Sequence, residues 1–316
     1  MTETVLLGTD DASLDRAAAL LRAGELVAMP TETVYGLAGD ACADASAAAI
    51  YAAKGRPSFN PLIAHVSTME MAREQVDFPP EALALARAFW PGPLTLVLPL
   101  KPGATVAPRI TAGLPTLALR MPGHPVARDL IARTGRPLAA PSANPSGRIS
   151  PTEPRHVMEG LGDRIAAVID GGPCGIGLES TILAVTPDGR ITLLRPGGID
   201  AGAVLARTGL TVTAPAPEAG IQAPGQMTSH YAPRGAVRLN ADTLLPGETL
   251  LGFGAVDSRY NLSPSGSLEE AAARLFRLLH DMDHDGVARI AVSPIPETGI
   301  GLAINDRLRR AAAPRG

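Results

Sequence analysis

Aromatic side chains and cysteines are both scarce in this chain of 316 residues. Only 3% of the residues are Phe, Trp or Tyr, so the sequence offers no aromatic platform on which single-stranded nucleic acid could stack. The two cysteines, Cys42 and Cys174, are far apart, and neither lies in a Cys-x-x-Cys motif or beside a histidine cluster. The pattern therefore indicates neither a disulfide framework nor a zinc site, and we expect both cysteines to be small buried residues.

Strong charge and long apolar runs are also missing. The formal net charge of −3 provides no bulk attraction to nucleic acid or to an anionic membrane. No segment approaches about 18 uninterrupted apolar residues, and the amino terminus is acidic rather than a basic and then apolar leader. These absences predict a cytoplasmic protein with no membrane partner. The length predicts about two domains.

Apolar segments alternate with helical patterns from about residue 13 to residue 207, which is typical of an α/β layer fold. The predicted strands span residues 26–29, 62–66, 94–98, 117–119, 137–140, 166–169, 181–185 and 191–194. The predicted helices span residues 13–23, 43–53, 69–75, 81–89, 125–133 and 155–161, the first with Ser13 as its N-cap. Because some of these strands lie only a turn apart and must be antiparallel, we expect a mixed sheet.

The composition changes between residues 208 and 235, where Thr, Pro, Ala and Gly dominate and the periodicity disappears. This is a linker by composition, but residues 223–234 carry too many specific polar groups for a plain spacer. A smaller α/β unit follows, with strands predicted at 249–253 and 290–292 and helices at 268–282 and 303–312. It resembles a small Rossmann-like layer without the Gly-x-Gly-x-x-Gly loop.

Lys54 is one of only two lysines in a chain that otherwise uses arginine, and it stands in the sequence Lys-Gly-Arg-Pro at positions 54–57. Pro57 favours an extended conformation for Arg56, and in an extended segment positions i and i+2 face the same way. Lys54 and Arg56 can then aim at one polyanion. A solvated turn is the alternative, since Gly-x-Pro sequences often mark loops.

A second polar segment, residues 141–147, has the same spacing. Pro145 favours an extended Asn144, which would place Ser142 and Asn144 on one face. The segment follows a short predicted strand, so these groups would lie past the carboxyl end of a strand, where ligands of open α/β sheets usually bind. The glycine-rich segment 171–177 is either a phosphate cradle or, as we expect, a hairpin loop that shapes a pocket near Ser180.

Six motifs together resemble a known family. They occupy residues 30–37 (Pro-Thr-Glu-Thr-Val-Tyr-Gly-Leu), 54–57, 61–66 (Pro-Leu-Ile-Ala-His-Val), 90–95 (Trp-Pro-Gly-Pro-Leu-Thr), 142–144 and 230–233 (His-Tyr-Ala-Pro). In this order they closely resemble the YrdC-like threonylcarbamoyl-AMP synthases of the long, two-domain form. The resemblance implies a YrdC-like domain with a twisted mixed sheet at 1–207, a linker or lid over the active site at 208–235, and a small Rossmann-like domain at 236–316.

The reaction implied by this resemblance joins L-threonine, bicarbonate and ATP into threonylcarbamoyl-adenylate and pyrophosphate, with Mg²⁺ accompanying the ATP. The family is a group of nucleotidyltransferases whose product serves the downstream tRNA threonylcarbamoyl-transfer machinery. An attack on the α-phosphorus is catalysed mainly by positioning and by neutralising negative charge. Lysine and arginine side chains suit that chemistry.

The resemblance also implies roles for individual residues. The expected catalytic residues are Lys54, Arg56, Ser142 and Asn144. The expected ATP-binding residues are Arg56, Asn60, Thr116, Ser142, Ser150, Arg195 and Tyr231, and the expected L-threonine-binding residues are Thr33, His65, Arg120, Ala140 and Ser180. No motif names the metal ligands, and Glu32 and Glu179 are candidates only.

Two other functions remain open at the level of the sequence. Arg148, Arg155 and Arg164 form a modest basic cluster, which would suit an RNA-binding factor or a weak RNA contact. Transfer of a carbamoyl group, as in the YrdC-like segment of hydrogenase-maturation proteins, is the second alternative. Those proteins carry cysteine clusters and an acylphosphatase-like part, and this sequence has neither.

Overall fold

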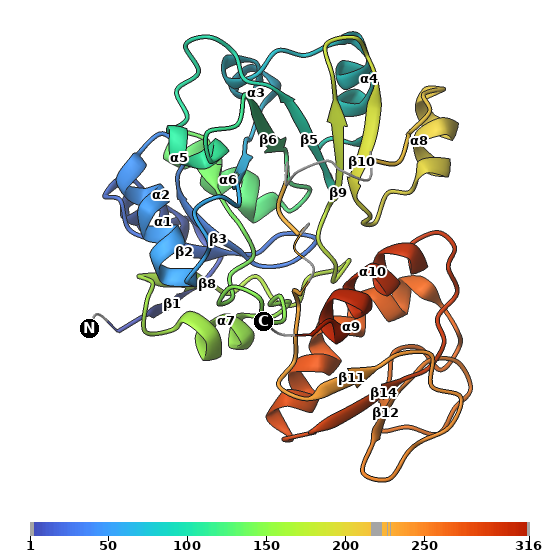
Figure 1. Cartoon of the computed structure of the whole chain (residues 1–316). Coiled ribbons are helices and arrows are strands. Elements are labelled where there is room, and N and C mark those ends of the chain that lie inside the picture. The colour runs from blue at the N-terminus through green and yellow to red at the C-terminus, as the bar shows by residue number, and fades with distance from the viewer. Residues whose placement is uncertain (1–2, 216–222, 226, 228, 315–316) are drawn as a thin grey trace.

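A computed structural model describes residues 3–215, 223–225, 227 and 229–314 and contains two sheets. The larger sheet has ten strands in the order β1-β8-β2-β3-β7-β4-β6-β5-β9-β10 and is mixed, as the sequence predicts. The smaller sheet has four parallel strands in the order β11-β14-β12-β13. Figure 1 shows the smaller unit, orange to red, below the larger one. The prediction of a mixed α/β fold with a second, smaller unit is confirmed.

The elements of the larger unit follow the predicted alternation. Its strands are β1 (Val5–Leu7), β2 (Val27–Met29), β3 (Gly36–Asp40), β4 (Ile63–His65), β5 (Leu94–Pro99), β6 (Thr116–Arg120), β7 (Leu138–Ala139), β8 (Ala167–Ile169), β9 (Thr181–Val185) and β10 (Ile191–Arg195). Its helices are α1 (Asp11–Arg22), α2 (Asp44–Lys54), α3 (Met69–Gln75), α4 (Pro80–Phe89), α5 (Pro108–Thr111), α6 (Pro125–Thr134), α7 (Pro154–Leu161) and α8 (Ala201–Thr208).

Helices cover both faces of the large sheet, and β2 shows how its residues divide between them. Val27 and Met29 join a core with α1 and α6, while Ala28 joins a core on the other face with α2 to α5 and α7. This alternation is the period of two that a strand imposes. The sheet is therefore buried on both sides, which suits its short, aliphatic strands.

Several local predictions are wrong. Helix α1 begins at Asp11, two residues before the predicted start at residue 13. Its N-cap is Asp10 rather than Ser13, and the Asp10 side chain accepts a hydrogen bond from the Ser13 N–H. Strand β3 was missed, since its Gly-Leu-Ala-Gly-Asp sequence is buried at every position and shows no alternation. Cys42 is only partly buried, unlike Cys174.

The segment 171–177 is not a hairpin loop. Strand β8 pairs with β1 and β2, whereas β9 pairs with β5 and β10, so the two strands that flank the segment are not neighbours in the sheet. The segment is instead a crossing connection. Tyr35 donates a hydrogen bond from its hydroxyl to the Gly172 carbonyl (2.8 Å), which ties this connection to the loop before β3.

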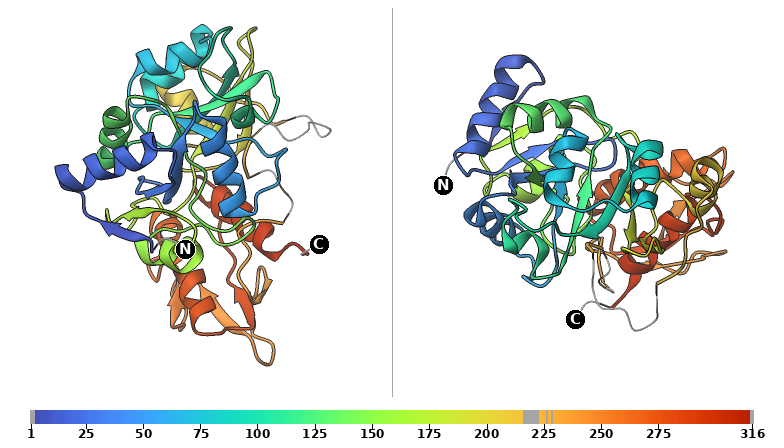
Figure 2. Two further views of the ribbon diagram at one scale, coloured as in Figure 1. Left: turned by 90° about the vertical axis from the view of Figure 1, so that its left-hand side faces the viewer. Right: turned by 90° about the horizontal axis from the view of Figure 1, so that it is seen from above.

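The smaller unit contains β11 (Ala236–Arg238), β12 (Thr249–Gly252), β13 (Tyr260–Asn261), β14 (Arg289–Val292), α9 (Leu268–His284) and α10 (Gly301–Ala312). Its apolar core also includes residues from outside the unit. These are Val34, Ile149 and Leu178 of the larger unit and Tyr231 of the linker. Figure 2 shows two further views of the two units. No helix among the described residues is long and apolar enough to cross a membrane.

Candidate active site

Nine of the predicted site residues meet at one small cavity, about 40 Å³ in volume. They are Thr33, Arg56, His65, Arg120, Ala140, Ser142, Ser180, Arg195 and Tyr231. Three of them lie on the strands β4, β6 and β10. The others lie in the loops that precede β3 and β9, in the loops that follow α2 and β7, and in the linker. Chain segments that are far apart in the sequence therefore converge as the resemblance implies.

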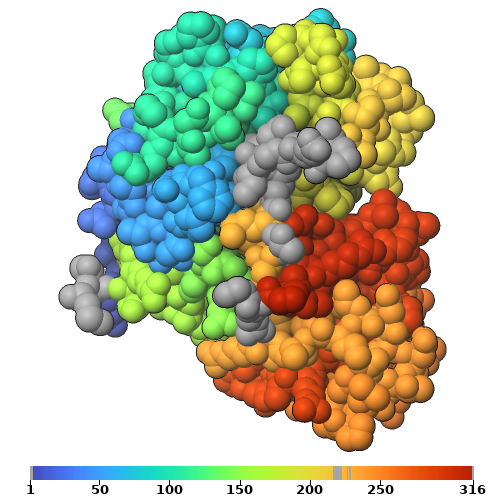
Figure 3. Space-filling view, in the orientation of Figure 1, coloured from blue at the N-terminus to red at the C-terminus, as the bar shows by residue number. Residues whose placement is uncertain are grey.

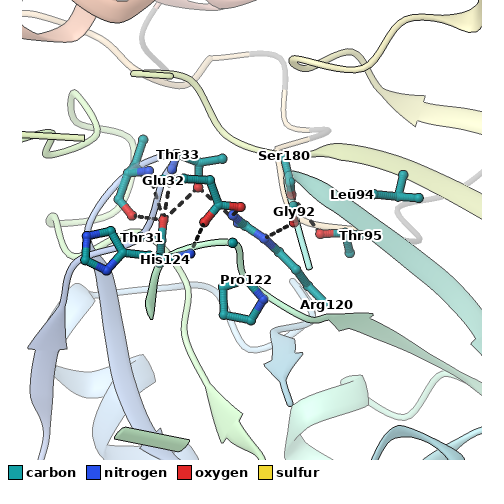
Figure 4. Close-up of polar contacts among 12 residues, drawn as sticks. Thr31, Glu32, Thr33, Gly92, Leu94, Thr95, Arg120, Pro122, His124 and Ser180 are labelled. Carbon is teal, nitrogen blue, oxygen red and sulfur yellow. Dashed lines mark hydrogen bonds and ion pairs between the residues drawn. The ribbon is translucent and has the colours of Figure 1, made fainter. Parts of the chain in front are cut away.

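Arg120 is the central cation at one end of this cavity (Figure 4). Its Nη2 donates to Glu32 Oε1 at 2.6 Å, Nη1 donates to Thr33 Oγ1 at 3.0 Å, and Nε donates to the Gly92 carbonyl at 3.2 Å. The side chain is almost fully buried. Burial would raise the pKa of Glu32, but the charge of Arg120 and the hydrogen bonds that the carboxylate accepts together outweigh burial and hold the pKa below its usual value. The arginine fork is thus fixed in one orientation.

Ser180 and Arg195 form the neighbouring wall. Arg195 donates to the Ser180 carbonyl from Nη2 (2.9 Å) and Nε (3.1 Å), and the Ser180 hydroxyl shares a hydrogen bond with Thr95 Oγ1 (2.7 Å). Gly225 closes over them with φ of 83°. A Cβ at this position would stand 2.9 Å from both Arg195 Cδ and the Tyr231 hydroxyl, so only glycine fits.

Arg56 is held by a short loop. Its Nη2 donates to Asn60 Oδ1 and to the Pro61 carbonyl, both at 2.7 Å, and its Nε donates to the Asn60 carbonyl at 3.0 Å. Burial lowers the pKa of Arg56 to about 10, which keeps it cationic at neutral pH. The guanidinium so held lines the cavity, where it can face an anionic ligand.

Lys54 does not lie in an extended segment, so that part of the prediction is wrong. It is the last residue of α2, and Gly55 caps the helix in the left-handed region (φ 61°). The buried ammonium donates to the carbonyls of Ser142 (2.5 Å) and Asn144 (2.6 Å). Burial, and then the charge of Arg56, lower the pKa of Lys54 well below its ordinary value. Lys54 thus holds the 142–144 segment in place.

The 142–144 segment is also not simply extended. Ser142 forms a β-bridge with Gly36, but the Asn144 N–H donates to the Ser142 carbonyl at 3.0 Å, which is a tight turn. Consequently Ser142 lines the cavity and Asn144 does not. The Asn144 amide instead donates to the carbonyls of Pro145 and Arg148 and stabilises the loop.

His65 lies on β4 and is fully enclosed. Its Nδ1 is 3.3 Å from the Ile63 carbonyl. Burial, with a smaller contribution from the charge of Arg120, lowers the pKa of His65 to about 3. His65 is therefore a neutral imidazole at the cavity wall and not a fixed positive charge.

Four predicted residues behind the cavity support its wall, and one lies elsewhere. Lys54, Asn60, Asn144 and Ser150 each bond to a wall residue or to its loop. Thr116 pairs with Pro99 at the end of β6 opposite to Arg120, so the structure does not bring it to the cavity. The cavity also contains residues that the sequence did not single out, namely Val34, Ile63, Pro141, Pro224, Gly225 and His230. Of these, Val34, Ile63 and His230 lie in the quoted motifs and Pro141 lies in the polar segment 141–147, while Pro224 and Gly225 stand out as a turn pair.

The carboxylates near the cavity are already paired. Both oxygens of Glu32 accept hydrogen bonds, from Arg120 and from the His124 N–H. Both oxygens of Glu179 do so as well, from Ser150 and from Arg307. Within the described part of the chain, no group of three or more His, Cys, Asp or Glu residues could hold a metal ion. Glu32 and Glu179 thus each have both carboxylate oxygens hydrogen-bonded.

A larger cleft of about 570 Å³ lies on the other side of the 142–148 loop, between α7 and α9. Asn144 is its only member from the predicted site. We take the smaller cavity as the site, because its lining carries convergent buried cations and hydroxyls. Two members of the basic cluster predicted for RNA are paired, since Arg155 pairs with Glu153 and Asp281, and Arg164 pairs with Asp163.

Two family models match the chain. One, described as "Telomere recombination" and covering Sua5, YciO and YrdC, matches residues 19–197, which is more than half of the chain. The other, described as "Threonylcarbamoyl-AMP synthase, C-terminal domain", matches residues 202–313.

Relatives of similar length support the same assignment. The threonylcarbamoyl-AMP synthase of Bacillus subtilis is 41% identical over 98% of this chain and 95% of its own length, and that of Pyrococcus abyssi is 41% identical over 95% and 94%. The crystal structure of P. abyssi Sua5 complexed with L-threonine superimposes with a TM-score of 0.89 at 37% identity and covers 98% of each chain. These matches confirm the resemblance of the six motifs: the chain belongs to the threonylcarbamoyl-AMP synthase family, in its long two-domain form.

Proposed function

We propose that this enzyme joins L-threonine, bicarbonate and ATP into L-threonylcarbamoyladenylate and releases pyrophosphate. One observation carries the proposal, namely the meeting of the buried side chains of Arg120, Arg56 and Arg195 with hydroxyl groups at a single small cavity. The relatives from B. subtilis and P. abyssi bear the name of this activity, and the P. abyssi structure contains L-threonine.

The Arg120 end of the cavity suits the amino acid. A guanidinium fork is the natural partner of a carboxylate, and threonine would exchange places with part of the present contacts of Arg120. The hydroxyls of Thr33 and Ser180 lie on the same wall and can pair with the polar groups of the substrate. His65, kept neutral by burial, adds a hydrogen-bonding group without a second positive charge.

The Arg56 and Arg195 end suits the nucleotide. The threonine amine and bicarbonate condense to a carbamate with loss of water, and a carbamate oxygen then attacks the α-phosphorus. The bond from that phosphorus to the bridging oxygen breaks, and pyrophosphate leaves with the electron pair. Negative charge spreads over the phosphate oxygens in this step, so two fixed guanidiniums lower its barrier. Lys54 contributes by fixing the Ser142 backbone at the cavity wall.

Mg²⁺ would enter this site with ATP. The paired state of Glu32 and Glu179 offers no protein cage, and Mg²⁺ commonly binds to substrate phosphates with few protein ligands. The ion would neutralise part of the triphosphate charge. In this proposal the residues of the chain supply orientation and the remaining positive charge.

The linker acts as a lid in this proposal. A cavity of about 40 Å³ is far smaller than the ~300–1,000 Å³ of common ligand sites, so a nucleotide needs the covering chain to move. Pro224, Gly225, His230 and Tyr231 are the linker residues that line it. A closed lid would exclude water from a mixed anhydride that hydrolyses readily.

The product would be consumed by the tRNA threonylcarbamoyl-transfer machinery, and we place the enzyme in the cytoplasm. The test of the function is pyrophosphate release from ATP by the purified chain, with threonine and bicarbonate added singly and together. Release that requires both substrates supports the proposal. Release from ATP that requires carbamoyl phosphate instead of threonine would favour carbamoyl transfer, and no release in any mixture would favour a binding protein.

A further inference from the structure

Arg307 belongs to α10 of the C-terminal unit, yet its side chain ends at the wall of the cavity in the other unit. Its Nε donates to Glu179 Oε2 at 2.8 Å, and Glu179 is a lining residue. Its Nη1 donates to Asp306 at 2.8 Å, and its guanidinium carbon lies 5.3 Å from the centre of the Tyr231 ring. Figure 3 shows the red surface of the C-terminal unit beside the yellow surface of the catalytic domain.

Glu179 is the only carboxylate that lines the cavity within the described residues. Ser150 donates to its Oε1 at 2.5 Å, and Arg307 occupies its Oε2. Burial would raise the pKa of Glu179, but the charges of Arg307 and Arg195 and the hydrogen bonds from Ser150 and Arg307 together outweigh burial and hold the pKa below its usual value. A negative charge beside a polyphosphate site opposes the ligand unless it is balanced. Arg307 is the cation that balances it from outside the cavity.

Tyr231 is the second residue that Arg307 touches. It is a non-glycine residue with φ of 62°, a strained conformation that persists only where the surroundings enforce it. Those surroundings come largely from the C-terminal unit, because the ring packs at 5.5 Å from Phe276 of α9 and beneath Arg307. The C-terminal unit therefore holds a strained linker residue at the cavity.

Stability alone is a weak explanation for this arginine. Arg307 is the largest fully buried side chain of the described residues, and replacing a buried ion pair by apolar side chains is often neutral or stabilising. Its Nη2, moreover, has no hydrogen-bond partner among the described residues. A buried guanidinium with an unused donor points to a role in the site rather than in the core.

We propose that Arg307 is the positioning residue through which the C-terminal unit prepares the cavity for ATP, by balancing Glu179 and by holding Tyr231. The inference rests on the proposed function. Three neighbours of Glu179, namely Ser150, Arg195 and Tyr231, are residues that the family resemblance assigns to ATP. The effect of Arg307 therefore belongs to the nucleotide and not to threonine.

The test compares Arg307→Met, Glu179→Gln and the double variant in steady-state pyrophosphate release. Because breaking a buried pair leaves an uncompensated charge, Arg307→Met is expected to raise the KM for ATP at least about tenfold, with the KM for threonine within about twofold. The double variant removes both charges and is expected to recover most of that ATP affinity. Arg309→Met is the matched control, since Arg309 lies on the same helix, is exposed and pairs with Glu297.

Two results would overturn the inference. One is an equal loss of ATP and threonine affinity in Arg307→Met, and the other is a double variant no better than Arg307→Met. If Arg307→Met does not fold, Arg307→Lys serves instead, because it keeps the charge but loses the flat face over Tyr231. It is expected to raise the KM for ATP about threefold or more, and an unchanged value would contradict the inference. Failure of the proposed function is seen separately, as absence of threonine-dependent release in the unmodified enzyme.

Discussion

Replacing Arg120 by lysine tests the assignment of the two ends of the cavity. Arg120 uses its three nitrogens on Glu32, Thr33 and Gly92, so it is oriented by a fixed frame. Lysine keeps the positive charge but cannot present two parallel N–H groups to a carboxylate. Losing one charge-assisted hydrogen bond costs about 1.5–3 kcal/mol, and each 1.4 kcal/mol is about tenfold. Arg120→Lys is therefore expected to raise the KM for threonine by roughly 10- to 100-fold.

The assay is pyrophosphate release with threonine varied at saturating ATP, and then with ATP varied at saturating threonine. We expect the KM for ATP to change by less than about threefold, because Arg56 and Arg195 are untouched. Arg133→Lys is the control, since Arg133 of α6 forms ion pairs with Asp11, Asp15 and Asp129 and does not line the cavity. A loss of ATP affinity with unchanged threonine affinity would refute the allocation of the cavity.

Three further predictions follow from the same site. Arg56→Ala should lower adenylate formation at least about a hundredfold without unfolding the chain, as judged by thermal melting, because removing one preorganised transition-state donor costs roughly 3–4 kcal/mol. Lys54→Ala should also lower adenylate formation, because the 142–144 segment loses the ammonium that holds its carbonyls. Near-normal turnover in both variants would make residues 54–57 merely structural. Tyr231→Ala, or a chain cut before residue 208, should give less threonylcarbamoyl-adenylate per ATP consumed than the full chain, and equal coupling in all three would reduce the linker to a tether. His65 is neutral in the fold, where burial lowers its pKa to about 3, while the unfolded chain takes up a proton near 6.5. The free energy of unfolding should thus fall as the pH drops from 6.5 towards 3. Between pH 7 and pH 5, the free energy measured by denaturant unfolding should fall by about 2 kcal/mol less in His65→Leu than in the unmodified chain.

The sequence predicts most of the elements because the helices carry strong periodic patterns and recognisable ends. It does not predict β3, where glycine and alanine replace the branched residues that mark strands. It also mistakes the 171–177 segment for a hairpin, because strand adjacency depends on the whole sheet order and not on the distance along the chain. Pairing of this kind is decided by tertiary contacts.

The candidate site could be predicted as a set of residues but not as a geometry. Lys54 and Arg56 were expected to aim at one target, whereas the end of α2 and the left-handed Gly55 send Lys54 to backbone carbonyls behind the wall. The role of Arg307 left no trace in the sequence. An arginine in an amphipathic helix is expected to be a surface cation. Only the packing of α10 against the catalytic domain shows that Arg307 is buried beside Glu179.

The central claim is that one cavity brings threonine, bicarbonate and ATP together. The most direct measurement incubates the purified enzyme with ¹³C-bicarbonate, L-threonine, ATP and Mg²⁺ and examines the products by mass spectrometry under rapid quenching. The account predicts an adenylate that carries both the ¹³C label and the threonine mass, formed in step with pyrophosphate. Pyrophosphate that accumulates with AMP alone, or with an adenylate that lacks the label, would contradict it.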